Sequence, residues 1–85
     1  MEIEYSSHFR RVYQKLVLPL KIKAEQKEFL FRKNPFDPKL KTHKLRGKLK
    51  EFHSFFIDHK NRIVFKFINS AKAVFLDIGD HQIYQ

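Results

Sequence analysis

The sequence predicts a single α+β domain spanning residues 1–85, in which an N-terminal strand and a helical hairpin pack on a small antiparallel sheet. Residues 8–32 repeat apolar side chains at helical spacing, and residues 51–78 hold three strand-like runs rich in aromatic residues. Two prolines within residues 34–40 separate these halves. With 85 residues and ten Phe, the chain has material for one compact core and not for two.

The composition indicates the kind of partner that the protein binds and excludes cysteine-based chemistry. Eighteen Lys and Arg against nine Asp and Glu give a formal net charge of +9, more than the ~2–8 that solubility asks of a small domain. This excess favours a polyanion or an acidic protein as partner. The absence of Cys excludes disulfides, thiolate nucleophiles and Cys-based metal sites. The apolar run at residues 16–20 is too short for a signal peptide or a membrane span, so we expect a cytoplasmic protein.

The first half of the chain is predicted to be a strand followed by two helices. Residues 1–5 alternate apolar and acidic side chains, as a short half-buried strand does. Ser6 or Ser7 is placed to cap a helix over residues 8–18. Pro19 either kinks this helix or starts a second one, which runs to about Arg32.

The second half is predicted to form strands over residues 51–57, 62–68 and 72–78, with Gly79 ending the last one. If residues 58–61 form a four-residue hairpin loop, Ile57 faces Arg62 and His53 faces Lys66. This register predicts His53, Arg62 and Lys66 on one accessible face. The opposite face is almost wholly apolar and is expected to pack on the helices; it would hold Phe52, Ser54, Phe56, Ile63, Phe65 and Phe67.

His53, Arg62 and Lys66 are residue types that metal-independent RNA cleavage requires. That reaction needs a base for the 2′-hydroxyl, a cation for the developing phosphorane charge, and an acid for the leaving 5′-oxygen. His81 and Tyr84 follow the last strand, where a short tail would reach the same face, and the Tyr84 ring would stack on a base. Each residue also has a plainer structural interpretation, and spacing alone leaves only a basic α+β binding domain.

Three segments, HKLRG at 43–47, NRIVFKF at 61–67 and AVFLDIGDHQIY at 73–84, together resemble the RelE/ParE superfamily of bacterial and archaeal type II toxins. The order of elements along the whole chain is similar too. Within the superfamily, the chain looks like the RelE and YafQ branch of ribosome-dependent mRNA interferases. The resemblance implies a RelE-like, microbial-RNase-like fold and an endoribonuclease activity that uses no cofactor and no metal.

The resemblance also implies roles for individual residues. Arg62 matches the strand arginine that holds the scissile phosphate, and His81 matches the position of the general acid. Tyr84 matches the C-terminal aromatic residue that orients the nucleotide. His43 matches the loop histidine of YafQ-like members, and His53 falls where RelE-like members place a catalytic lysine.

The general base stays open among His53, His43 and Glu51. RelE-like members have a second basic residue two places after the first, and this chain has Phe55 there. We expect additional RNA contacts from basic side chains, namely Lys44, Arg46, Lys48 and Lys66.

The partners that the resemblance implies are a cognate acidic antitoxin, mRNA and the ribosome, with the free toxin a monomer and the antitoxin complex a hetero-oligomer. Two alternatives remain. A ParE-like member with the same fold poisons DNA gyrase through protein contacts and needs no general acid, so His81 argues for the nuclease. The other alternative is a non-catalytic RNA-binding domain.

Overall fold

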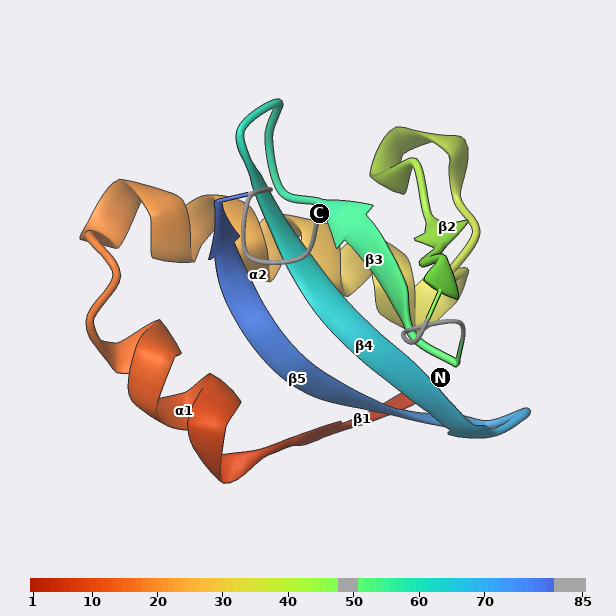
Figure 1. Cartoon of the computed structure of the whole chain (residues 1–85). Coiled ribbons are helices and arrows are strands. Elements are labelled where there is room, and N and C mark those ends of the chain that lie inside the picture. The colour runs from red at the N-terminus through yellow and green to blue at the C-terminus, as the bar shows by residue number, and fades with distance from the viewer. Residues whose placement is uncertain (48–50, 81–85) are drawn as a thin grey trace.

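The computed structural model describes residues 1–47 and 51–80. Two helices and a five-stranded sheet make up most of this part of the chain (Figure 1). In chain order the elements are β1 (Glu2–Tyr5), α1 (Ser7–Gln14), α2 (Leu18–Lys33), η1 (Pro38–Leu40), β2 (His43–Lys44), β3 (His53–Phe56), β4 (Asn61–Asn69) and β5 (Lys72–Asp80). The predicted α+β class is confirmed.

The strands lie side by side in the order β1-β5-β4-β3-β2. The sheet is mixed, because β1 joins its edge parallel to β5, with Glu2 opposite Lys72 and Tyr5 opposite Phe75. The other three strand pairs are antiparallel. The first and last strands described are therefore direct neighbours.

Local sequence signals set the helix starts. The Ser6 side chain accepts a hydrogen bond from the Phe9 backbone N–H at 3.0 Å and caps α1 as predicted. Pro19 lies in the first turn of α2, where its missing N–H costs no helical hydrogen bond. Val17 is extended between the helices, so α1 ends at Gln14, earlier than predicted. Among residues 1–47 and 51–80, no helix is long and apolar enough to cross a membrane.

The core lies between the two helices and one face of the sheet. Phe31 of α2 stacks on Phe55 at 5.2 Å between ring centroids and meets Phe65 and Phe75 edge-on at 4.9 and 5.1 Å. Phe9 of α1 also meets Phe75, at 5.6 Å. Both helices thus cover the same face, and each fully buried aromatic side chain contributes about 1.5–3 kcal/mol.

The register predicted for the β3–β4 hairpin is wrong by one residue on β3. Phe56 pairs with Arg62, and His53 pairs with Phe65, where we expected Ile57 with Arg62 and His53 with Lys66. Residues 57–61 separate the paired Phe56 and Arg62, and the Ile57 N–H donates to the Asn61 carbonyl at 2.9 Å. Side chains alternate along a strand, so this shift moves His53 to the helix side of the sheet, away from Arg62.

The Asp58 side chain closes this longer loop. Its carboxylate accepts hydrogen bonds from the backbone N–H groups of Lys60 at 2.8 Å and Asn61 at 2.7 Å. Burial opposes ionisation, but these hydrogen bonds outweigh it and lower the pKa of Asp58. An anionic Asp58 therefore holds the loop that sets the β3–β4 register.

Candidate functional site

The face of the sheet opposite the helices, which we call the outer face, collects several of the predicted site residues. On β4, Ile63 and Phe65 point into the core, so the alternate residues point outward. Cross-strand pairing then assigns the neighbours on β2 and β3. The outer face thus carries His43, Ser54, Phe56, Arg62, Val64 and Lys66.

Arg62 is the buried cation of this face, with only 7% of its surface exposed. It lies between Phe56 on β3 and Gly79 on β5. Gly79, the direct partner of Arg62 on β5, has no side chain to cover it. A guanidinium held in this way presents a rigid fork of donors that matches phosphate geometry.

His43 of β2 is held through both ring nitrogens. Nδ1 lies 3.0 Å from the Lys41 carbonyl oxygen, which accepts a hydrogen bond, so the neutral ring carries its proton on Nδ1. Nε2 lies 3.2 Å from the hydroxyl of Ser54, which donates to it. The lone pair of Nε2 therefore points to the Ser54 hydroxyl, and the exposed ring also packs 5.9 Å from that of Phe56.

Ser54 is fully buried and holds the His43 ring. Sequence reasoning placed Ser54 on the apolar face and gave it no role. A single hydroxyl in an otherwise aromatic strand was the available signal.

Further along the outer face, the charges are paired. The Lys66 ammonium lies 3.4 Å from Glu51, and both side chains are largely exposed. Asp77, opposite Val64, pairs with His8 of α1 at 3.1 Å. The exposed Lys66–Glu51 pair exchanges readily with a competing anion, since a pair of this kind contributes about 0–1 kcal/mol.

His53 is packed on the helix side. Its ring stacks on Phe65 at 5.5 Å and meets Phe67 at 5.1 Å and Phe36 at 6.2 Å. The Nδ1 atom has no hydrogen-bond partner in the described part of the chain. Burial first, and then the nearby charges of Lys44 and His43, lower the pKa of His53. The expectation that His53 shares a face with Arg62 and Lys66 is therefore wrong.

The remaining predicted residues are spread more widely. Lys44 lies opposite His53 and so shares its side of the sheet, and Arg46 is exposed after β2. The predictions for His81, Tyr84 and Lys48 lie outside the described residues. Within 1–47 and 51–80, no group of three or more His, Cys, Asp or Glu side chains is placed to hold a metal ion.

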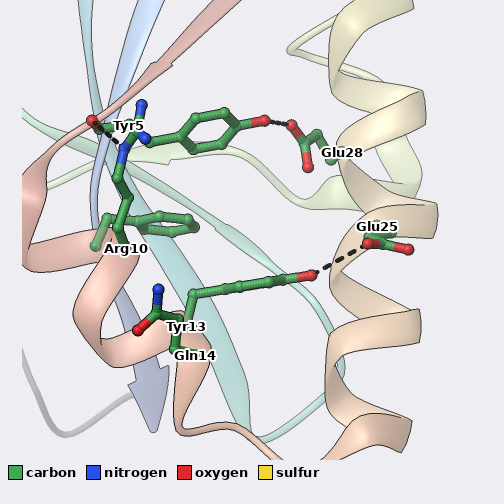
Figure 2. Close-up of a pocket in the computed structure, with 7 residues that line it drawn as sticks. Tyr5, Arg10, Tyr13, Gln14, Glu25 and Glu28 are labelled. Carbon is green, nitrogen blue, oxygen red and sulfur yellow. Dashed lines mark hydrogen bonds between the residues drawn. The ribbon is translucent and has the colours of Figure 1, made fainter.

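A cleft of about 440 Å³ lies away from the outer face, between α1 and α2 (Figure 2). Figure 2 shows the Tyr5 and Tyr13 hydroxyls reaching toward Glu28 and Glu25 of α2, to which they donate. Burial, and then the Glu25 charge, raises the pKa of Tyr13; burial also raises the pKa of Glu28, against the opposing charge of Arg32. These groups satisfy one another, so we assign the cleft to helix packing.

The fold is shared with solved toxin structures. The chain superimposes on a YoeB/ParE toxin from Agrobacterium tumefaciens with a TM-score of 0.80 and 18% identity, over 95% of this chain and 99% of that one. It superimposes on YafQ from E. coli with a TM-score of 0.74 and 21% identity, over 96% of this chain and 94% of that one. It superimposes on a chain of the YoeB–YefM complex from Staphylococcus aureus with a TM-score of 0.77 and 19% identity, over 95% of this chain and 97% of that one.

No protein-family model matches the sequence, and no curated protein does. At these identities the similarity establishes the architecture. The RelE-like fold that the resemblance in three short segments implied is thus confirmed along nearly the whole chain.

Proposed function

We propose, on the premise of this shared fold, that the chain is the toxin of a type II toxin–antitoxin system and a metal-independent endoribonuclease that cuts mRNA on the ribosome. The observation that supports this most is the juxtaposition on the outer face of a buried guanidinium, Arg62, with a histidine whose tautomer is set, His43. Lys66 adds a second cation to the same face.

The first chemical step in this proposal is proton removal by His43. The Lys41 carbonyl keeps the proton on Nδ1, so Nε2 is the basic nitrogen. When a substrate 2′-hydroxyl takes the place of the Ser54 hydroxyl at Nε2, the ring accepts its proton. The 2′-oxygen then attacks phosphorus, and the bond to the 5′-oxygen breaks to leave a 2′,3′-cyclic phosphate. His53 is the less suitable base because it lies on the other side of the sheet.

Arg62 and Lys66 stabilise the charge that develops on the phosphorane. The Arg62 fork, pre-positioned by its burial, contacts two phosphate oxygens, and Lys66 exchanges Glu51 for the substrate. The family resemblance assigns the remaining roles. His81 donates the proton that the leaving 5′-oxygen takes up, and Tyr84 stacks on the nucleotide.

An acidic antitoxin is the second part of the proposal. The Staphylococcus aureus relative was solved as a complex with YefM. Here, four apolar side chains are exposed at the start and along the outside of α2, namely Val17, Leu18, Ile22 and Phe29. With a net charge of +9 around them, an amphipathic acidic segment is the complementary ligand. The toxin would then be a cytoplasmic monomer when free and a hetero-oligomer when neutralised.

Primer extension on mRNA in a reconstituted translation reaction tests the nuclease. The native chain should produce codon-registered cuts, and Arg62→Ala should reduce them by about 10²–10³-fold. His81→Ala should reduce them by about 10²–10⁴-fold, as expected for a general acid. Arg11→Ala, on the exposed side of α1, is the control and should cut normally. Intact message together with trapped gyrase–DNA complexes would instead select the ParE-like function.

A further inference from the structure

A second cavity, of about 360 Å³, lies at the end of β3 between α2, the turn after η1 and the β3–β4 loop. Three lysines line it, namely Lys27 of α2, Lys39 of η1 and Lys41, which caps η1. Phe56 and the exposed His59 lie at the same cavity. This gathering of cations has no part in the mechanism described above.

The three lysines are positioned by local structure. The Lys27 ammonium donates to the Lys39 carbonyl at 3.5 Å, which ties α2 to η1. Lys41 has a φ of 52°, in the left-handed region that residues other than Gly rarely adopt. It ends η1 in this conformation, and its N–H donates to the Pro38 carbonyl. The same Lys41 carbonyl orients His43, so one short turn serves both sites.

Within the part of the chain that the structure describes, the positive charges that line the cavity outnumber the negative ones. Asp58 is the one carboxylate in its lining, and Lys23 already lies 3.8 Å from it. Among the described residues, no ion pair joins Lys27, Lys39 or Lys41 to a carboxylate. Three lysines around one cavity, with a single carboxylate that already pairs with Lys23, attract an anion with several oxygens, such as a phosphate.

The cavity adjoins the outer face through Phe56. This residue lines the cavity, lies directly opposite Arg62 on β4, and packs its ring 5.9 Å from that of His43. β2 pairs with β3 at His53 and Ser54 and not at Phe56. A nucleic-acid strand with one phosphate at Arg62 therefore meets an aromatic ring and then the lysines as it passes the end of β3.

We propose that this cavity is a phosphate subsite for the RNA strand, next to the scissile position. The inference rests on the proposed nuclease function and adds to it a place where the flanking backbone is held. Lys27, Lys39 and Lys41 neutralise one or two flanking phosphates, and Phe56 supports the nucleotide between them and Arg62.

The salt dependence of RNA binding tests the subsite. The probe is a single-stranded 2′-O-methyl RNA of about ten nucleotides, which has no attacking hydroxyl and stays intact. Its affinity is measured by fluorescence anisotropy between about 50 and 200 mM salt. Each phosphate contact contributes about 0.7 to the slope of log K against log salt. The triple variant Lys27→Gln, Lys39→Gln, Lys41→Gln should therefore lower the slope by about 0.7–1.4.

A matched variant separates the subsite from bulk charge. Lys15→Gln, Lys21→Gln, Lys33→Gln removes the same charge from the ends of α1 and α2 and should keep the native slope. Equal losses in both variants, or none in the cavity variant, would overturn the inference. So would loss of binding to a polyglutamate peptide with RNA binding unchanged, because the cavity would then serve an acidic protein.

A folding control and a cleavage measurement distinguish a misfolded variant, a failed nuclease proposal and a failed subsite. Circular dichroism reports whether the triple variant folds; if it does not, Lys39→Gln alone, at an exposed side chain, should still lower the slope. The probe is never cleaved, so an inactive native chain would contradict the nuclease proposal while leaving the slope measurable. A native slope in the cavity variant, with normal message cleavage, would contradict only the subsite.

Discussion

His43 and His53 lie on neighbouring strands, yet they differ in almost every property that matters to chemistry. His43 pairs with Ser54 and Lys44 pairs with His53, so the two histidines point to opposite sides of the sheet. His43 is exposed, with a partner at each ring nitrogen. His53 is packed among phenylalanines, with a lowered pKa. The face that a residue occupies, and not its type, decides whether it is available to a substrate.

The largest effect expected from this comparison is on cleavage. His43→Ala removes the proposed base and should lower the rate of message cleavage by about 10²–10⁴-fold. His53→Ala should leave the rate within about tenfold of native, because His53 acts only through packing. Single-turnover primer extension on stalled ribosomes gives both rates. The reverse order of effects would move the active site to the helix side of the sheet.

A large difference in stability is expected between Phe55 and Phe56, which are adjacent in sequence. Phe55 is fully buried and stacks on Phe31, so Phe55→Ala should lower the free energy of unfolding by about 3–5 kcal/mol. Phe56 is only half-buried on the outer face, so Phe56→Ala should lower it by less, about 1 kcal/mol. Urea denaturation followed by circular dichroism measures both. Similar losses at the two positions would contradict the assignment of faces.

An intermediate effect is expected at Ser54, which holds the His43 ring. Ser54→Ala removes one hydrogen bond, which contributes about 0.5–1.5 kcal/mol, and should lower KM by about two- to tenfold with little change in kcat, because the substrate no longer has to displace the Ser54 hydroxyl from Nε2. The corresponding change in unfolding free energy should be no larger than that of the hydrogen bond. If kcat falls instead, with KM unchanged, Ser54 orients His43 during proton transfer and is not displaced by the substrate.

The smallest expected effect is a pH dependence of stability that is caused by His53. Its pKa is lowered by folding, so the unfolded chain takes up a proton more readily than the folded one as pH falls below the ordinary value of 6.5. The native chain should therefore lose stability relative to His53→Phe between about pH 8 and about pH 5. Thermal unfolding of both chains across this range measures the difference. Parallel curves would show that His53 is as accessible to protons as it is in the unfolded chain.

Much of the fold could be predicted from the sequence, because the signals are local. The alternation of Ile63, Phe65 and Phe67 gave the correct buried face of β4, and Ser6 and Pro19 marked the helix starts. The face of β3 could not be predicted in the same way. Its two sets of alternate residues each contain two large apolar side chains within 52–57, so periodicity does not distinguish them.

The ambiguity about the face of β3 also made the predicted grouping of the site residues wrong. The loop closes through Ile57, Asp58 and Asn61, one residue earlier than a four-residue loop requires. A shift of one residue reverses every side chain on the strand, so His53 was grouped with Arg62 and Ser54 was assigned to the core. Arg62, His43 and Lys66 share a face in the structure, and only the pairing across β2–β4 reveals it.

The parallel pairing of β1 with β5 has a consequence for how the protein is made. β1 is synthesised first among the strands, but its neighbour in the sheet ends at Asp80. Tyr5, Phe9 and Phe31 therefore lack their common partner, Phe75, until nearly the whole described chain has been translated. Contacts so distant in sequence slow folding and make it cooperative. A partly synthesised chain thus lacks the complete sheet, and we expect the outer face to assemble only late in translation.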